Sequence, residues 1–279
     1  MPTLISALLE KERALAEWLR AHAPILVGYS GGVDSVYLAA VAVETLGSAS
    51  VLAVIGRSAS YPEEQWRTAR ESAARLGLRV LEIDTDELSD PRYASNPTNR
   101  CYYCKTELWQ RLRAVAADRK LTTVVDGTNA DDLHDWRPGA RAAREHDVQS
   151  PLADLGFTKS EIRERSRARG LPTWSQPSSP CLSSRIPYGT PVTTGRLRQV
   201  EAAERALRAL GIGGDLRVRH HGPLGRIEMP RELLNDWLVP ERSARLARAL
   251  RSAGFERVAI DLRGFRSGSL NVLQGVTAA

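Results

Sequence analysis

Short β-rich runs alternate with longer helical patterns over the first half of this 279-residue chain, and this order limits the possible folds more than any other property. Such alternation is typical of a parallel sheet covered by helices. We expect strands at Ile25–Tyr29, Val51–Ile55, Arg79–Ile83 and Thr122–Val125. The helices expected among them cover about residues 4–21, 34–46, 62–76 and 102–119. A further helix should begin after Thr158, because TKSE has the spacing of a capping box closed by Glu161.

The pattern changes after the segment LPTWSQPSSPCLSSRIPYGTP, which is too rich in Pro, Ser and Gly for a regular helix or a central strand. This segment is a linker or a functional loop. Beyond it we expect a helix at about 193–210, two short strands around HHGPLG, a helical pair and a last strand near Arg257–Asp261. The predicted fold is therefore α/β, with a parallel Rossmann-like sheet in residues 1–175 and a smaller α+β domain in residues 176–279.

Composition and charge exclude several classes of protein. Hydrophobic residues make up 42% and charged residues 26%, as in ordinary soluble enzymes, and no run approaches the roughly 20 apolar residues that span a membrane. Charges interrupt the apolar residues of the N-terminal segment, unlike those of a signal peptide, so we expect a cytoplasmic protein. The net charge of +6 comes from four lysines and 35 arginines without a basic block, which favours solvated helix faces over a nucleic-acid surface.

The sharpest local motif is ILVGYSGGVDSVYLAAVA, in which an apolar strand runs through SGGVDS into an amphipathic helix. A glycine pair lets the backbone approach an anion, and the free amides of the helix start favour negative charge. We therefore interpret five residues as a phosphate cradle: Ser30, Gly31, Gly32, Asp34 and Ser35. The loop has neither the lysine of a Walker motif nor the GxGxxG of dinucleotide folds. A tight turn without a ligand remains the alternative.

Three cysteines form the second motif: Cys101 and Cys104 as a C-x-x-C at a helix start, and Cys181 77 residues later. An odd number excludes complete pairing as disulfides and fits a reducing compartment. A structural zinc site would need a fourth ligand, and unligated thiols are the other alternative. Three thiolates on an iron-sulfur cluster leave one iron without a protein ligand, which can carry sulfide to a substrate. We favour the cluster.

SGGVDS resembles the pyrophosphate loop of the ATP-pyrophosphatase superfamily, whose members share the adenine nucleotide alpha hydrolase-like fold. The resemblance implies that the loop binds ATP, that AMP is transferred to a substrate oxygen with release of pyrophosphate, and that Asp34 helps to hold Mg²⁺. The segment DGTNADD is a second matching element, which implies that Gly127 and Asn129 line the nucleotide pocket and that Asp131 is a further magnesium ligand. Helix capping is the alternative role for Asp131 and Asp132.

Over nearly its whole length the chain resembles the LarE family of sulfur transferases, which act in nickel-pincer nucleotide biosynthesis. The matching segments are GYSGGVDS, NPTNRCYYCK, DGTNADD, RPG with the following ARAAREHDVQSPL, PCLSSRIPYG, LRVRHHG and GFRSGSLN. The resemblance implies a homo-oligomer that adenylates a carboxylate of a pyridinium mononucleotide and converts it to a thiocarboxylate. It also implies a [4Fe-4S] cluster on Cys101, Cys104 and Cys181 as the sulfur carrier. In family members with a single cysteine, the residue at the position of Cys181 is sacrificed instead.

The substrate of that family carries a phosphate, and LRVRHHG offers arginines that suit it. Arg217 and Arg219 are two apart on an expected strand, so their side chains should lie on one face. Arg185, in the loop of Cys181, is a weaker candidate, because a loop arginine can simply brace the backbone. The alternative for Arg217 and Arg219 is that they are ordinary arginines on the exposed face of a strand.

Three other functions compete with this one. A tRNA thiolase can combine the same phosphate loop with three cysteines, and tight tRNA retention on a gel would favour it. An ammonia-using ligase such as NAD synthetase has no use for the cysteines. A nucleotide-sensing module would release no pyrophosphate. The segment LRVRHHG favours a small-molecule nucleotide as the partner over nucleic acid or a membrane.

Overall fold

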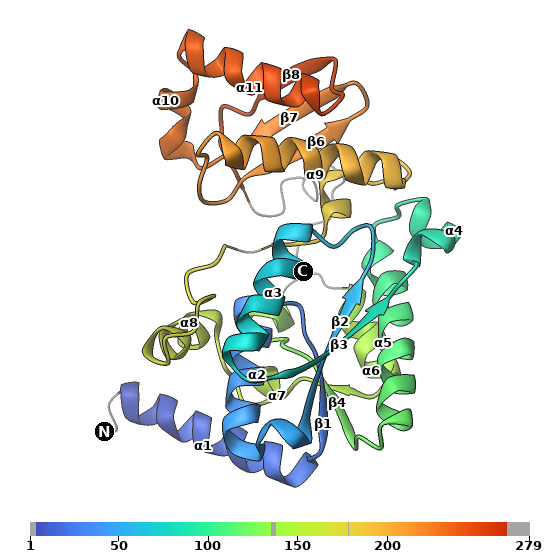
Figure 1. Cartoon of the computed structure of the whole chain (residues 1–279), viewed down its shortest axis with the longest axis vertical. Helices are drawn as coiled ribbons and strands as arrows, with labels where there is room; N and C mark the ends of the chain where they lie inside the picture. The colour runs from blue at the N-terminus through green and yellow to red at the C-terminus, as the bar shows by residue number, and fades with distance from the viewer. Residues whose placement is uncertain (1–3, 135–137, 178, 267–279) are drawn as a thin grey trace.

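The computed structural model describes residues 4–134, 138–177 and 179–266. Two bodies follow each other along the long axis of the molecule (Figure 1). The larger body is built on a five-stranded sheet and the smaller one on a three-stranded sheet. The α/β class predicted from the sequence is confirmed, whereas the domain boundary between residues 175 and 176 stays a prediction.

The larger sheet is entirely parallel and has the strand order β3-β2-β1-β4-β5. Its first strand lies at the centre, where Ile25 is paired with Val51 on one side and Thr123 on the other. The chain first adds β2 and β3 on one side of β1 and later adds β4 and β5 on its other side. In parallel sheets, ligands bind at such a switch point, beside the carboxyl ends of the strands. The strands are β1 (Ile25–Gly28), β2 (Val51–Arg57), β3 (Arg79–Asp84), β4 (Thr123–Val125) and β5 (Val148–Gln149).

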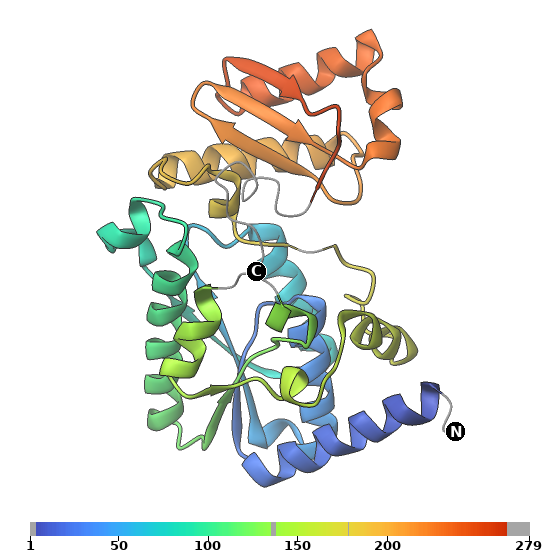
Figure 2. The same ribbon diagram turned by 180° about the vertical axis from the view of Figure 1, so that it is seen from behind.

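Helices cover both faces of this sheet (Figures 1 and 2). Successive strand side chains point to opposite faces, so Ile25 and Val27 pack into one core cluster and Leu26 into another. The first cluster includes residues of α1 (Leu4–His22), α2 (Val33–Leu46), α3 (Glu63–Arg75), α7 (Pro151–Asp154) and α8 (Lys159–Ala168). The second includes residues of α5 (Arg100–Asp118) and α6 (Pro138–Glu145).

The smaller sheet has the order β6-β7-β8, with an antiparallel pair followed by a parallel pair. A separate core cluster joins it to its helices. The strands are β6 (Arg217–His221), β7 (Leu224–Glu228) and β8 (Arg257–Ile260), and the helices are α9 (Thr194–Ala209), α10 (Leu234–Trp237) and α11 (Pro240–Ser252). Short elements complete the chain: η1 (Ser48–Ser50), η2 (Glu87–Ser89), α4 (Pro91–Ala94), η3 (Asp131–His134), η4 (Leu182–Arg185) and η5 (Arg231–Leu233).

Several local predictions can be compared with these elements. The capping box is confirmed, because Thr158 accepts from the Glu161 amide and Glu161 accepts from the Thr158 amide. The described residues of the loop between α8 and α9 form turns and the one-turn helix η4, as its Pro and Ser content predicts. Arg137 of the RPG motif and residues 267–271 of GFRSGSLN lie outside the described residues.

In the part of the chain that the structure covers, no helix has the length and apolar character needed to cross a membrane.

Candidate active site

The phosphate loop occupies the turn between β1 and α2. Gly31 has a positive φ of +70°, and a Cβ added there would lie 2.5 Å from the Cβ of Ala69 in α3. Glycine is therefore required at this position for two independent reasons. Gly32 is the N-cap of α2, so the free amides of the helix start follow directly. This geometry agrees with the anion-binding turn expected from SGGVDS.

Hydrogen bonds within the loop and from α3 fix its shape. The hydroxyl of Ser35 donates to the Gly32 carbonyl at 3.1 Å and accepts from the Ser30 amide at 3.3 Å. The Ser30 carbonyl accepts from the Tyr61 hydroxyl and from the Gln65 amide group, both at 2.9 Å. The loop is thus held from the side of α3, and its conformation does not depend on a ligand.

A lysine from a distant helix reaches the acidic residue of the loop. Lys159, the first residue of α8, forms an ion pair with Asp34 through its Nζ atom. Its backbone amide donates to Asp131 at 2.8 Å. Lys159 therefore holds together the two carboxylates that the sequence suggested for magnesium. The sequence analysis did not select this lysine, although the TKSE cap correctly placed it at a helix start.

The two carboxylates suit a hard divalent cation. The Oδ1 atom of Asp34 is buried and has no hydrogen-bond partner within the described ranges. A buried carboxylate oxygen without a partner is unfavourable unless a ligand satisfies it. Mg²⁺ prefers such oxygen ligands together with substrate phosphates. Asp34 and Asp131 would therefore hold the ion that accompanies ATP.

The DGTNADD segment packs against the start of α2. A Cβ on Gly127 would lie 2.9 Å from the backbone nitrogen of Ser35, so this glycine allows β4 to approach the phosphate loop. Asn129 is buried, and its side-chain oxygen accepts from the amides of Asp131 and Asp132 at 3.0 and 3.2 Å. Asn129 therefore shapes the turn that presents Asp131. Asp132 accepts from the Asn129 amide, which is the capping role considered as its alternative.

The three cysteines come from two separate segments and meet between the bodies. Cys101 and Cys104 lie in the first turn of α5, Cys181 directly precedes η4, and all three are half-buried free thiols. Burial raises the pKa of Cys101, and the charge of Cys181 raises it further. Burial also raises the pKa of Cys104, followed by the charges of Glu87 and Cys181. Cys181 therefore lies close enough to both thiols of α5 for its charge to raise their pKa values.

This thiol cluster (Cys101, Cys104 and Cys181) is not a complete metal site as it stands. Within residues 4–134, 138–177 and 179–266, no three His, Cys, Asp or Glu side chains are arranged to hold a metal ion. The donor set nevertheless has the chemistry of iron-sulfur ligation, because it consists of thiols alone. The chemistry of the three thiols therefore suits iron-sulfur ligation, and the cluster itself stays a prediction.

A short chain of contacts connects the thiol cluster to the phosphate loop. The amide of Leu182, next to Cys181, donates to the carbonyl of Ser60 at 2.8 Å. The following residue, Tyr61, is the one that donates to the Ser30 carbonyl. The turn after β2 therefore contacts the phosphate loop and also the loop that contains Cys181 and η4, which we call the cysteine loop. Cys181 and the phosphate loop thus lie against the same turn of the chain.

Arg185, the arginine of the cysteine loop, forms its hydrogen bonds with other groups of the protein. Arg185 is 2% exposed and makes two contacts with Glu204 of α9, at 2.8 and 2.9 Å. Its Nη1 atom donates to the carbonyls of Pro180 and Cys181 at 2.6 and 3.1 Å. Arg185 therefore braces the backbone that carries Cys181, as its alternative reading stated. A direct phosphate contact by Arg185 stays a prediction.

The two strand arginines lie on the same side of β6 and are buried rather than exposed. Arg219 pairs with Glu228 at 2.7 Å and donates to the Ser184 carbonyl at 2.9 Å, which ties β6 to the cysteine loop. Arg217 lies 3.6 Å from a carboxylate oxygen of Asp215. Burial and then the charge of Arg185 lower the pKa of Arg217 to about 10. The three arginines therefore lie together at the cysteine loop, and phosphate binding by them stays a prediction.

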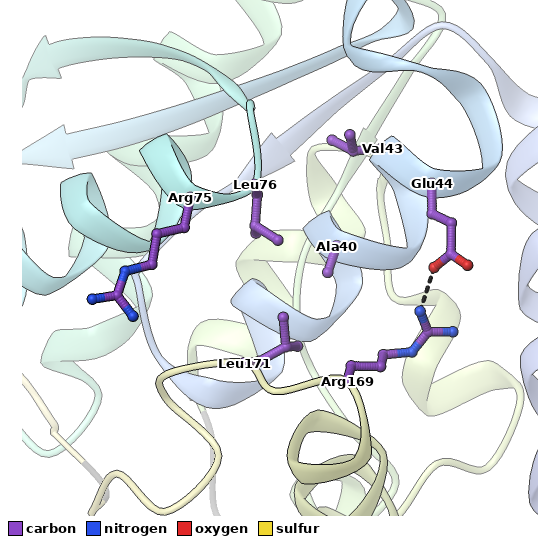
Figure 3. A pocket seen from close by; sticks show the side chains of 7 residues that line it. All are labelled: Ala40, Val43, Glu44, Arg75, Leu76, Arg169 and Leu171. Atoms are coloured by element: carbon purple, nitrogen blue, oxygen red, sulfur yellow. Dashed lines mark hydrogen bonds and ion pairs between the residues drawn. The ribbon is translucent and has the colours of Figure 1, made fainter.

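A shallow pocket of about 300 Å³ lies elsewhere, between the end of α2, the end of α3 and the residues after α8 (Figure 3). An ion pair between Glu44 and Arg169 borders it. None of the residues selected from the sequence lines this pocket. Its lining consists of Ala40, Val43, Glu44, Arg75, Leu76, Arg169 and Leu171. We therefore place the candidate active site at the phosphate loop and the thiol cluster.

Comparison with known proteins supports this choice. The sequence model of the NAD synthase family matches residues 15–129, which include the phosphate loop. The pyridinium-3,5-bisthiocarboxylic acid mononucleotide synthase of Lactiplantibacillus plantarum is 36% identical over 267 residues, which cover 96% of each chain. The chain belongs to the LarE family of ATP-dependent sulfurtransferases.

Two further relatives cover the chain almost as fully. An uncharacterised protein of Synechocystis is 42% identical over 246 residues, or 88% of this chain and 91% of the relative. An uncharacterised protein of Methanocaldococcus jannaschii is 29% identical over 245 residues, or 87% and 91%. These matches extend through the cysteine loop into the smaller body, which the NAD synthase family does not cover. The LarE resemblance thus concerns both bodies.

Proposed function

We propose that this LarE-family enzyme uses ATP to activate a carboxylate of a pyridinium mononucleotide and converts it to a thiocarboxylate in nickel-pincer nucleotide biosynthesis. The observation that carries the proposal is the match along 96% of both chains to a synthase named for a pyridinium bisthiocarboxylic acid mononucleotide. The contacts from Ser60 to Leu182 and from Tyr61 to Ser30 support it, because they join the two half-reactions in one site.

The phosphate loop would bind the β- and γ-phosphates of ATP through its backbone amides and the start of α2. Asp34 and Asp131 would hold Mg²⁺ against the phosphates, and Lys159 adds the positive charge that the loop itself lacks. A substrate carboxylate oxygen then attacks the α-phosphorus, and the bond from this phosphorus to the bridging oxygen breaks. Pyrophosphate leaves, and the carboxylate becomes an acyl adenylate with AMP as a good leaving group.

The second half-reaction replaces AMP by sulfur. A [4Fe-4S] cluster on the three thiolates would supply that sulfur, because one iron has no protein ligand. Cys101, Cys104 and Cys181 would hold it, and Arg185 keeps the Cys181 loop in place through two backbone carbonyls. The position of this loop against the turn after β2 keeps the sulfur close to the adenylated carboxylate.

The substrate phosphate would be bound by the arginines behind the cysteine loop. Arg217 and Arg219 are the main candidates, because both belong to β6 and lie two residues apart on one side of it, and Arg185 is the weaker one. Guanidinium groups bind phosphate through paired hydrogen bonds. Such contacts would fix the carboxylate between the phosphate loop and the thiol cluster. The family resemblance also supports a homo-oligomer.

Sacrifice of Cys181 is the alternative source of sulfur. In that reaction the sulfur of Cys181 leaves with the product and dehydroalanine remains. Cys101 and Cys104 would then have no chemical role, although both lie close enough to Cys181 for its charge to raise their pKa values. This arrangement favours the cluster.

The direct test is incubation of the anaerobically purified chain with ATP, Mg²⁺ and the pyridinium dicarboxylate mononucleotide. We expect AMP and pyrophosphate in equal amounts and a product in which sulfur replaces oxygen, as seen by mass spectrometry. An amide product formed from ammonia would contradict the proposal. Specific retention of tRNA on a gel at moderate salt would instead favour a tRNA thiolase.

A further inference from the structure

Asn96 fastens the loop after Cys181 to the segment before α5. It is fully buried and has a φ of +60°, a left-handed conformation that asparagine tolerates better than most residues. Its Nδ2 atom donates to the carbonyls of Pro187 and Thr190, each at 2.8 Å. Its own carbonyl accepts from the amide of Gly189 at 2.9 Å. Asn96 therefore fixes the far side of the cysteine loop.

Arg100 continues this connection to the thiols. It is 3% exposed, and its Nη1 atom donates to the side-chain oxygen of Asn96 and, at 3.0 Å, to the carbonyl of Ser183. The guanidinium lies 5.4 Å from the ring centroid of Tyr188. Arg100 thus contacts three groups around the cysteine loop: the side chain of Asn96, the carbonyl of Ser183 and the ring of Tyr188.

The charge of Arg100 has an unusual environment. A buried guanidinium is normally paired with a carboxylate, because an unpaired buried charge is unfavourable. In the described parts of the chain, Arg100 forms no salt bridge, and its buried Nε atom has no hydrogen-bond partner. This unpaired charge lies beside the thiol cluster, because Arg100 directly precedes Cys101 and donates to the Ser183 carbonyl, two residues after Cys181.

We propose that Arg100 is the positioning residue of the thiol cluster: it holds the Cys181 loop against α5 and supplies the buried positive charge that an anionic iron-sulfur cluster requires. The first role concerns the chain alone. The second rests on the proposed function. A merely structural arginine would affect the loop but not the redox properties of a bound cluster, and this difference makes the two roles separable.

The positioning role is tested without iron. A bifunctional bimane that fluoresces when it bridges two thiols reports whether Cys101 and Cys181 are close, and Cys104→Ala limits the reaction to this pair. In this background we compare Arg100→Met, Arg100→Lys and the control Arg111→Met, which removes an exposed arginine from the same helix. We expect the bridged fraction of the alkylated protein to fall several-fold with Arg100→Met and to stay unchanged with Arg111→Met. An unchanged fraction in Arg100→Met would overturn the positioning role.

The charge role is tested on the reconstituted full chain with all three cysteines. We expect Arg100→Met to weaken iron binding by about 10- to 100-fold, as is typical when a group behind the metal ligands is removed. We also expect the cluster potential to shift to more negative values, because loss of a positive charge disfavours the added electron. Arg100→Lys keeps the charge, so its potential should stay near that of the wild type. Iron binding and potential equal to those of Arg111→Met would overturn this role.

Two further outcomes are informative. If the wild type takes up no iron, the cluster of the proposed function and the charge role of Arg100 both fail, while the bimane assay still decides the positioning role. If Arg100→Met does not fold, as judged by circular dichroism, Arg100→Lys replaces it in the bimane assay, because lysine has a similar length but cannot donate to Asn96 and Ser183 with the same planar group. A wild-type bridged fraction in Arg100→Lys would then count against the positioning role.

Discussion

Lys159 at the start of α8 forms an ion pair with Asp34 of the phosphate loop, although the two residues are 125 positions apart in the sequence. The pair occupies one oxygen of Asp34 and leaves the other, Oδ1, buried without a partner in the described structure. ATP with Mg²⁺ would satisfy this oxygen and place its phosphates beside the ammonium group of Lys159. The pair therefore prepares the loop for a charged ligand.

Lys159→Met tests this relationship. We expect the rate of substrate-dependent pyrophosphate release to fall by about 100-fold, because removal of one preorganised charge from the transition state typically has an effect of this size. Lys120→Met is a suitable control, since Lys120 lies beyond the far end of α5. Equal rates for both variants would show that Lys159 only orients Asp34 in the absence of nucleotide.

Gly31→Ala tests the requirement for glycine in the loop. Alanine at a positive φ costs about 1 kcal/mol, and the short contact with Ala69 adds about 2 kcal/mol of overpacking. Gly77→Ala is the matched control, because Gly77 has a φ of +62° but open space around its Cβ position. Urea unfolding should show a larger loss of stability for Gly31→Ala, and this variant should also release little pyrophosphate. Similar losses for both variants would contradict the packing argument.

Glu12 should control stability at acidic pH. It accepts hydrogen bonds from Tyr37, Arg165 and Arg169, and so connects α1 to α2 and α8. Burial acts to raise the pKa of Glu12, but the hydrogen bonds from Arg165, Arg169 and Tyr37 outweigh it and the pKa is lowered from 4.5. Because folding lowers the pKa of Glu12, its ionised carboxylate stabilises the folded state above pH 4.5. This contribution is lost as the pH falls through the pKa that Glu12 has in the folded state.

Glu12→Gln is the corresponding variant. At neutral pH it should reduce the free energy of unfolding by about 1.5 kcal/mol, because the half-buried Arg165 loses its carboxylate partner and Arg169 keeps only Glu44. The difference from the wild type should shrink as the pH is lowered below 4.5. Denaturant unfolding at several pH values measures both effects. A difference that does not change with pH would contradict the role of the Glu12 charge.

Arg217→Met tests the phosphate site of the substrate. We expect the KM for the mononucleotide to rise by at least about tenfold, because a hydrogen bond to a charged group contributes about 1.5 to 3 kcal/mol. The KM for ATP should not change, since Arg217 belongs to β6 and not to the phosphate loop. Arg257→Met, which removes an exposed arginine from the opposite edge of the same sheet, should leave both values unchanged. A wild-type KM in Arg217→Met would show that this arginine is structural.

Much of the fold could be predicted because it depends on local patterns. The apolar runs of β1 to β4, the helices between them and the capping box of α8 all have sequence signals that act within one element. The strand β5 was not predicted, because a two-residue strand has no periodicity. The short helices α4 and α7 were missed for the same reason.

The residues that complete the site depend on contacts between distant segments. Burial of Arg219 follows from Glu228 on the next strand, and that of Arg185 from Glu204 on α9. No local pattern marks Glu87 as a buried neighbour of Cys104. Arg100 stands next to Cys101 in the sequence, but its connection to Asn96 and Ser183 becomes visible only in three dimensions. Sequence motifs therefore predict where the chemistry takes place, whereas the residues that support this candidate site become visible only in the fold.

The central claim is that three thiols from two segments act together as the sulfur-carrying site. Anaerobic iron and sulfide analysis of the wild type and of Cys101→Ala, Cys104→Ala and Cys181→Ala, with the intact protein mass recorded after turnover, tests it most directly. We predict four irons in the wild type, as a [4Fe-4S] cluster requires, loss of iron in each variant, and an unchanged protein mass. Equal iron in wild type and Cys181→Ala, or a mass reduced by one H₂S after turnover, would contradict the claim.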